Sequence, residues 1–330
     1  MKNKIVITGG QGFIGNHLLN MLIDKYPDRE FIAIDRKETI IQTINSSQHI
    51  IHNTKSNKNL TIYKTDINKW LPEVDDVDVV VHLAALPSVR DSDKNVERVI
   101  EDNILATQKI IDKCIDSWKP SRLIITSSSS VYNGDHNWPM KSSDDVRPLS
   151  PYAVSKLTNE LTLQMYKNNG KLGNIQGIVI RPFTVFGPNQ RDELCIQAII
   201  DAFIKDEVFT LYGSGEQKRD FCYIDDTCSA IEALMFTPNL KHFIYNIGTG
   251  KNISINEVIT KIGRIFNKPL KIKYEPPTIY DCMYTKADIS HMKEDCNWEP
   301  KMDFDRGLME QIKFQCMESK YPDYSGFELK

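Results

Sequence analysis

A glycine-rich turn between an apolar strand and a helix is the feature that most constrains the fold of this chain. The turn reads Thr8-Gly9-Gly10-Gln11-Gly12-Phe13-Ile14-Gly15. It follows a short apolar run and opens an amphipathic stretch, the context in which such glycines bind a dinucleotide. Gly9 suits a tight turn, Gly12 lets the backbone approach a pyrophosphate, and Gly15 lets the helix pack closely on the strand. We therefore expect a pyrophosphate at the N-terminus of this helix.

Asp35 ends the second apolar run, about 20 residues after Gly15, which is the spacing that a dinucleotide fold requires. A carboxylate there accepts hydrogen bonds from the adenosine ribose and repels a 2′-phosphate, so it favours NAD over NADP. Arg36 follows immediately and softens that preference. An isolated acid at a strand end is often merely solvated, but the preceding glycine pattern favours a binding role. We predict NAD as the cofactor.

The bulk properties exclude several classes of protein. A chain of 330 residues allows one large or two modest domains, and a net charge of −3 without a basic block argues against nucleic-acid binding. No apolar run approaches the roughly 18 residues of a membrane span, and the N-terminus lacks a signal-peptide pattern. Seven scattered cysteines form no Cys-x-x-Cys pair, so we expect neither a disulfide framework nor a metal site. A soluble cytoplasmic protein is the expectation.

Apolar runs alternate with helical patterns through the first half of the chain. Strands are predicted at 4–8, 31–35, 60–64, 78–83, 122–127 and 177–181, and helices at 13–25, 96–117 and 151–168. Such an order predicts an α/β fold with a Rossmann-type, doubly wound parallel sheet. The polar stretch 37–59 reads as a loosely packed crossover. We expect an NAD-binding domain over 1–181 and a smaller mixed α/β substrate domain over 182–330, with some segments returning to the first domain.

Tyr152 and Lys156 form the second signal. Ser150 and Pro151 suit a helix start, and residues four apart share a helix face, so the phenol and the ammonium lie side by side. A nearby cation typically moves the pKa of a tyrosine about 1–3 units toward its charged form. The phenol is thereby expected to act as a general base. A surface pair is the alternative reading, and the nucleotide-binding context favours catalysis.

A run of hydroxyl side chains, 126–130, follows the predicted strand 122–127. At the carboxyl end of a central strand these side chains face the ligand cleft. One of them is placed to hydrogen-bond a substrate oxygen and to share its proton with Tyr152. A serine run is usually only a loop, and its position favours a functional role here.

These motifs together resemble one family nearly from end to end. They comprise 8–15, Asp35, Asp66-Ile67, His82-Leu83-Ala84-Ala85, Asn103, Ser128 with Tyr152 and Lys156, 181–188, Arg219-Asp220 and Tyr245-Asn246-Ile247-Gly248. The chain resembles the extended short-chain dehydrogenase/reductase family, in its nucleotide-sugar epimerase/dehydratase branch.

The resemblance implies a role for each matching residue. Ser128, Tyr152 and Lys156 are expected to be the catalytic triad, with Lys156 also holding the nicotinamide ribose. The expected cofactor contacts are Gly9, Gly12, Phe13, Ile14, Gly15, Asp35, Asp66, Ile67, Leu83, Ala84, Ala85, Asn103, Tyr152 and Lys156. The expected substrate contacts are Ser128, Ser129, Thr184, Arg191, Arg219 and Asp281.

The resemblance also implies a reaction in which Tyr152 takes the proton of the sugar 4-hydroxyl while C4 gives its hydride to NAD. The similar 4,6-dehydratases carry Asp-Glu where Ser129 and Ser130 stand, and a hydroxyl cannot replace those carboxylates. Return of the hydride to the other face, which is 4-epimerisation, is therefore the predicted outcome. A 4,6-dehydratase, a 4-keto reductase that consumes cofactor, and a non-catalytic NAD- or sugar-nucleotide-binding module are the alternatives.

The substrate is expected to be a UDP-sugar, with Arg219 on its diphosphate. Thr184 and Arg191 resemble the UDP-glucuronate 4-epimerases, whereas UDP-glucose or UDP-GlcNAc is the other possibility. Asp192 and Glu193 depart from the family pattern beside that arginine, and residues 278–281 depart from it near the nucleotide ribose. The helices at 96–117 and 151–168 resemble those through which family members form homodimers.

Overall fold

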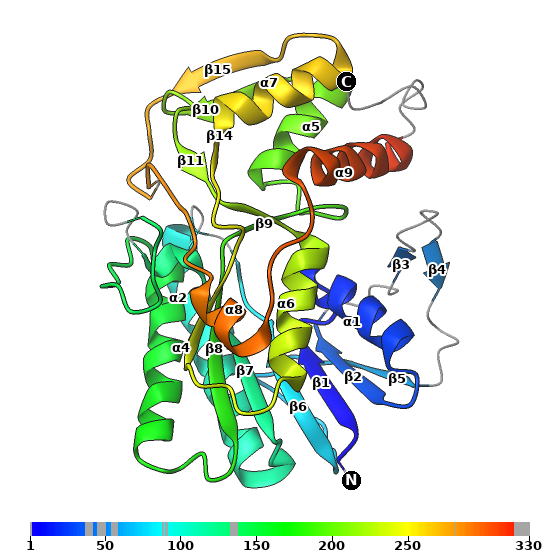
Figure 1. Ribbon diagram of the computed structural model, residues 1–330, viewed down its shortest axis with the longest axis vertical. Coiled ribbons are helices and arrows are strands. Elements are labelled where there is room, and N and C mark those ends of the chain that lie inside the picture. Colours follow the sequence, from blue (N-terminus) through cyan, green and yellow to red (C-terminus); the bar gives the residue numbers. More distant parts are fainter. Residues whose placement is uncertain are drawn as a thin grey trace.

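A parallel sheet of seven strands lies at the centre of the molecule (Figure 1). The computed structural model describes residues 2–36, 42–44, 51–53, 59–87, 89, 92–132, 138–280 and 282–319. The strands of the sheet are β1 (Lys4–Thr8), β2 (Glu30–Asp35), β5 (Leu60–Lys64), β6 (Val77–His82), β7 (Arg122–Thr126), β8 (Gln176–Pro182) and β13 (Ile244–Ile247). Their order is β13-β8-β7-β6-β1-β2-β5. The strand order reverses at β1, so the crevice for a ligand opens beside the end of β1.

Helices cover both faces of the sheet, because strands such as β1 carry apolar side chains on both faces. Ile5 and Ile7 are buried in the cluster that includes Leu18 and Leu22 of α1 (Phe13–Lys25). Val6, between them, points to the opposite cluster. Alternate side chains thus enter two different cores, which is why the strands read as continuous apolar runs. Besides α1, the covering helices are α3 (Ala106–Lys113), α4 (Pro151–Asn168) and α6 (Ile224–Phe236).

The predicted elements of the first half are confirmed, each strand within one residue at either end. The helices at 13–25 and 151–168 have the predicted bounds. The predicted helix at 96–117 is a succession of α2 (Val96–Val99), η3 (Ile100–Leu105), α3 and η4 (Cys114–Trp118), in which η3 and η4 are π-helical turns. Within 37–59, the short strands β3 (Gln42–Ile44) and β4 (Ile51–Asn53) pair antiparallel, which periodicity did not predict. Residues 37–41, 45–50 and 54–58 lie outside the described part.

Figure 1 places most of the C-terminal elements together at one end of the sheet. They include α5 (Cys195–Lys205), β10 (Val208–Tyr212), α7 (Ile255–Phe266), β15 (Lys271–Glu275) and α9 (Phe304–Glu318). The shorter elements are η2 (Ser92–Asn95), η5 (Ser129–Val131), β9 (Thr184–Phe186), β11 (Lys218–Arg219), β12 (Phe221–Tyr223), β14 (Ile253–Ser254) and α8 (Ser290–Cys296). Several elements beyond residue 181 return to the sheet: β13 pairs with β8, α6 packs on α1, and α8 packs on β13. The domain division at residue 181 is kept as a proposal.

Among the described helices, none combines the length and the apolar character that a bilayer span requires.

Candidate active site

The glycine turn forms a cradle that side chains would fill. Gly9 has a φ of +70°, and a Cβ there would lie 2.7 Å from the backbone nitrogen of Ala84. A Cβ on Gly15 would lie 2.2 Å from the carbonyl oxygen of Gly9. Gly12 is the N-cap of α1 and offers no side chain to the N–H groups of Phe13, Ile14 and Gly15 in the first turn. The turn therefore fits a pyrophosphate, since these donors and the helix dipole favour an anion.

Asp35 lies at the end of β2, beside this turn. Its Oδ2 accepts a hydrogen bond from the backbone N–H of Gln11 at 3.0 Å. The Gln11 side-chain amide is buried and has no hydrogen-bond partner among the described residues. Buried polar groups in native proteins are normally paired, so this amide fits a cofactor that supplies its partner. The carboxylate and the glycine turn thus lie together, as the spacing predicted.

Two further segments border the same crevice. Asp66 and Ile67 lie two and three residues after the end of β5. Ile67 is buried, and Asp66 accepts a hydrogen bond from the N–H of Asn68 at 2.9 Å. The residues Leu83, Ala84 and Ala85 directly follow β6 and are half-buried. The glycine turn, Asp35 and these two segments therefore stand at the carboxyl ends of β1, β2, β5 and β6. Their individual contacts with NAD stay predictions.

A neutral histidine bridge, which the sequence did not reveal, holds the Ala84 segment to β1. His82 Nδ1 lies 2.6 Å from Thr8 Oγ1, and its Nε2 lies 2.9 Å from Thr107 Oγ1. Burial, aided by the charge of Lys156, lowers the pKa of His82 to about 3. The ring is therefore neutral at pH 7, so it can both donate and accept. Thr8 Oγ1 also accepts a hydrogen bond from the N–H of Ala84 at 3.3 Å.

Asn103 joins the segment after β6 to the helix α4. Its Oδ1 accepts the N–H of Leu86 at 2.7 Å, and its Nδ2 donates to Ser155 Oγ at 2.9 Å. Asn103 is fully buried, so these bonds are shielded from solvent. In the structure it braces two segments of the site, whereas its predicted contact with the cofactor itself stays untested.

The helix α4, which carries Tyr152 and Lys156, begins where the sequence predicted. Ser150 is its N-cap and accepts a hydrogen bond from the N–H of Ala153 at 3.1 Å, while Pro151 occupies the first turn. Tyr152 lies in that first turn and Lys156 one turn later. The ammonium of Lys156 lies 5.7 Å from the centre of the Tyr152 ring and donates to the carbonyl oxygen of Thr126 at 2.8 Å. Thr126 is the last residue of β7, so a backbone carbonyl of the sheet fixes the position of the Lys156 ammonium.

Ser128 approaches the phenol from the loop after β7. Its backbone is extended, and its hydroxyl accepts the N–H of Ser130 at 3.1 Å at the start of η5. A hydrogen bond between Ser128 and Tyr152 favours the ionised phenol. The three predicted catalytic residues, from two separate segments, therefore meet at one place. Ser129 lies half-buried in the same short helix.

The direction of the Tyr152 pKa corrects an expectation. Burial raises the pKa of Tyr152, while the hydrogen bond to Ser128 and the charge of Arg191 act in the opposite direction. The expected net lowering of the Tyr152 pKa is therefore wrong for this structure, because burial outweighs the groups that favour the phenolate and the Lys156 ammonium donates to the Thr126 carbonyl. Burial lowers the pKa of Lys156 to about 8. The hydroxyl and Arg191 therefore stabilise the phenolate.

Replacing Ser128 by alanine is expected to shift the pH dependence of turnover. The hydrogen bond from Ser128 favours the phenolate, so its loss raises the pKa of Tyr152 further. Activity at neutral pH should fall, and the rising limb of the kcat–pH profile should move to more alkaline pH. Ser128→Thr should restore the profile, and Ser130→Ala should leave its midpoint in place. An unchanged midpoint in Ser128→Ala would remove Ser128 from this role.

Of the other predicted substrate residues, Thr184, Arg191 and Arg219 lie in the described part of the chain. Thr184 begins β9 and is half-buried. Arg191 donates from Nη2 to the carbonyl oxygen of Pro87, and its Nη1 lies 2.8 Å from Oε1 of Glu193. Arg219 ends β11, where its Nη1 donates to the Lys218 carbonyl at 3.0 Å. Asp281 lies outside the described residues.

A buried ion pair behind the site also escaped the sequence reading. Arg181 donates from Nε and Nη2 to the two carboxylate oxygens of Glu160, at 2.8 and 2.6 Å. Its Nη1 donates to the hydroxyl of Tyr132 at 2.7 Å, which donates in turn to Asn246 Oδ1 at 2.9 Å. Glu160 belongs to α4 and Tyr132 follows η5, so one guanidinium joins the two segments from which Tyr152 and Ser128 meet.

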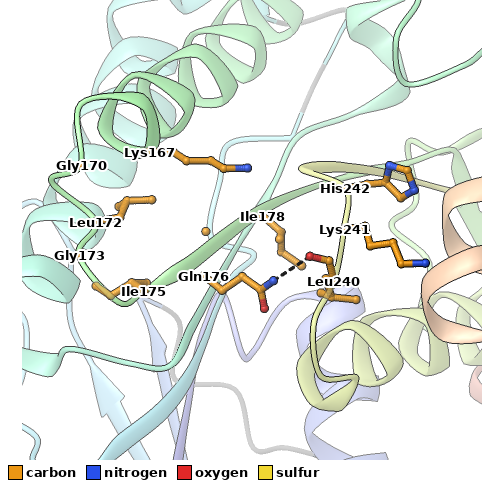
Figure 2. A pocket seen from close by; sticks show the side chains of 11 residues that line it. Lys167, Gly170, Leu172, Gly173, Ile175, Gln176, Ile178, Leu240, Lys241 and His242 are labelled. Carbon is orange, nitrogen blue, oxygen red and sulfur yellow. Dashed lines mark hydrogen bonds between the residues drawn. The ribbon is translucent and has the colours of Figure 1, made fainter.

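Figure 2 shows a cavity of about 360 Å³ that is separate from this site. It lies at the amino end of β8 and is lined at one side by Lys167, near the end of α4. Lys167 lies 15 residues after Tyr152 on that helix, about 22 Å along the axis. Lys241 and His242 on the other side already face Asp295 and Glu294. The cavity therefore takes no part in the chemistry at Tyr152.

Comparisons with known proteins agree with this geometry. The sequence matches the NAD dependent epimerase/dehydratase family over residues 5–248. A UDP-glucuronate 4-epimerase of Thermodesulfobacterium geofontis is 30% identical over 315 residues, which cover 94% of this chain and 95% of the relative. The protein YtcB of Bacillus subtilis, described as an uncharacterised UDP-glucose epimerase, is 30% identical over 315 residues, covering 94% and 97%. The structure of MoeE5 in complex with UDP-glucuronic acid and NAD has a TM-score of 0.86 at 30% identity, covering 96% of this chain and 99% of that chain.

Proposed function

The chain belongs to the NAD dependent epimerase/dehydratase family, and from that membership we propose that it is a UDP-sugar 4-epimerase acting on UDP-glucuronate. Its cofactor is NAD, as throughout this family, and the fold is the Rossmann-type fold predicted from the sequence. When bound in the crevice, NAD would supply reversible hydride transfer at C4 of the sugar. The residues of the chain hold the two ligands and move the proton.

The observation that carries the proposal is the meeting of Ser128, Tyr152 and Lys156 beside the glycine cradle. Tyr152 removes the proton from the sugar 4-hydroxyl. It returns the proton to the same oxygen after the opposite face of C4 has been presented to the cofactor site. Ser128 hydrogen-bonds the phenol and lowers the cost of its ionised form. Lys156, held by Thr126, keeps a positive charge within reach of the ring. General-base catalysis of this kind typically contributes about 10²–10⁴ to the rate.

The neighbours of the phenol favour epimerisation over dehydration. Removal of water requires a further acid and base, and the positions beside Ser128 hold Ser129 and Ser130. The Ser130 hydroxyl is buried and has no partner among the described residues. The charge of Arg191, which also acts on Tyr152, is positive. These surroundings support proton exchange at one oxygen without elimination.

Arg191 supports a uronate as the sugar. Its guanidinium is half-buried and close enough to Tyr152 for its charge to lower the phenol pKa. A guanidinium binds a carboxylate through two parallel hydrogen bonds, which a neutral hydroxymethyl group cannot form. Glu193 is 54% exposed. A contact so open to solvent is worth about 0–1 kcal/mol and yields easily to a substrate carboxylate.

Incubation of the purified protein with UDP-glucuronate, UDP-glucose, UDP-GlcNAc and the corresponding dTDP- and GDP-sugars, without added cofactor, tests the proposal. NMR should show the C4 epimer of UDP-glucuronate. Arg191→Leu should raise KM for UDP-glucuronate by about 10- to 150-fold, the value of a lost hydrogen bond between charged groups. The same change should alter KM for UDP-glucose little. A 4-keto-6-deoxy product would mean dehydration, and turnover that needs added NADH would mean a reductase.

We further propose a homodimer built on α4 and the α2–η3 segment. These neighbouring helices expose a set of large apolar side chains, which are Val96, Ile100, Leu105, Val154, Leu161 and Met165. Apolar side chains gathered on one face mark an interaction surface. Sedimentation of the purified protein at micromolar concentration should show twice the chain mass, and a monomer would refute the dimer. Cytoplasmic location stays a prediction from the sequence.

A further inference from the structure

Arg36 directly follows Asp35, where the adenosine ribose of NAD is expected, and its guanidinium lies against a buried carboxylate. Nη2 of Arg36 is 2.8 Å from Oδ2 of Asp102, and Nη1 is 3.9 Å from Oδ2 of Asp66. The Asp102 side chain is 5% exposed, whereas that of Arg36 is 45% exposed. A carboxylate so far removed from water requires a cationic partner. Asp102 therefore determines where the guanidinium lies.

The position of Arg36 matters because an arginine near the ribose is the group that accommodates the 2′-phosphate of NADP. Guanidinium and phosphate pair strongly, with two parallel hydrogen bonds. Asp35 alone therefore does not explain selectivity for NAD, since the next residue carries the side chain that NADP would recruit. The second cation on Asp102 is Arg98, whose Nε lies 3.3 Å from the same Oδ2. Moving Arg36 to a phosphate would leave Asp102 with this more exposed partner.

We propose that Asp102 is a cofactor-specificity residue, which holds Arg36 away from the adenosine ribose and so keeps the site selective for NAD. Asp35 repels a 2′-phosphate, and Asp102 withholds the cation that would attract one. Both carboxylates therefore disfavour NADP, Asp35 by repelling its phosphate and Asp102 by restraining Arg36. Removal of both is required before Arg36 can bind the phosphate of NADP.

The test compares full-length variants in an Asp35→Ser background, so that the repelling carboxylate is absent from all of them. Each protein is equilibrated with equimolar NAD+ and NADP+, separated from free nucleotide, and denatured by heat, and the released nucleotides are quantified by chromatography. Adding Asp102→Asn should raise the bound NADP+ to NAD+ ratio at least tenfold. In the triple variant Asp35→Ser/Asp102→Asn/Arg36→Ala, the ratio should return to that of the Asp35→Ser protein.

The matched control is Glu101→Gln in the same background. Glu101 is the exposed neighbour of Asp102, so its replacement makes the same change in net charge without touching Arg36. It should leave the ratio within twofold. An equal rise in this control, a rise that survives Arg36→Ala, or no rise with Asp102→Asn would each overturn the proposal.

Arg36→Ala in the Asp35→Ser protein provides a second measurement that does not depend on the folding of any Asp102 variant. An arginine held by Asp102 contributes little to NADP+ binding, so the ratio should stay within twofold. A tenfold fall would show that Arg36 already reaches the phosphate while Asp102 is intact, and the proposal would be wrong.

Discussion

Turnover of the Tyr152→Phe protein is expected to fall by about 10²–10⁴, the usual contribution of a positioned general base. The phenol is the group that meets Ser128 and lies beside Lys156, and phenylalanine removes its oxygen while keeping the ring. Because the ring and the glycine cradle remain, NAD content and UDP-sugar affinity should change little. Loss of kcat without loss of binding is the signature of an interaction that acts in the transition state.

The same helix offers a matched control for this replacement. Tyr166 accepts a hydrogen bond from Gln108 Nε2 at 2.8 Å and lies near the far end of α4. Tyr166→Phe also removes one phenol oxygen, yet it should leave kcat within twofold. Near-normal turnover in Tyr152→Phe would contradict the assignment of Tyr152 as the general base. Equal losses in both variants would point to damage of the helix instead.

Replacing Arg181 by methionine is expected to lower the free energy of unfolding by about 3–5 kcal/mol. The side chains of Arg181 and Glu160 are 3% and 4% exposed, so removal of the cation leaves a buried carboxylate without its partner. The Tyr132 hydroxyl loses a partner at the same time. Urea unfolding followed by circular dichroism should show the loss as a lower midpoint.

The double variant Glu160→Leu/Arg181→Met separates the charge from the packing. Removing both partners of a buried ion pair is often close to neutral, so most of the lost stability should return. Lys205→Met is the comparison at the surface, since it breaks the more exposed pair with Asp201 and should cost less than about 1 kcal/mol. If the double variant is no more stable than Arg181→Met, the loss comes from packing around the guanidinium and the ion-pair account is wrong.

Features that depend on neighbours in the chain were predictable from the sequence. The glycine turn, the acid at the end of β2 and the helix start at Ser150 and Pro151 all lie where the patterns placed them. Each follows from local geometry, such as the spacing of glycines or the four-residue repeat that brings Tyr152 and Lys156 to one face. The sequence pattern was sufficient for these because no distant residue is needed to form them.

Features that depend on distant segments were not predictable. Lys156 is held by the carbonyl of Thr126, 30 residues away in the chain. Arg36 is held by Asp102 from a different strand–helix unit. The raised pKa of Tyr152 is a result of burial, which no spacing between two residues reports. In each case the deciding quantity is loss of water around a charge or a long-range contact.

The sequence by itself determined the strand–glycine–helix unit, the acid at the end of β2 and the side-by-side placement of Tyr152 and Lys156, because short-range geometry and residue type suffice for them. Only the tertiary structure decided how Tyr152 titrates, what holds Lys156, and where Arg36 is directed. Those outcomes are set by desolvation and by contacts that exist only once the sheet, α4 and the segment around Asp102 have packed together.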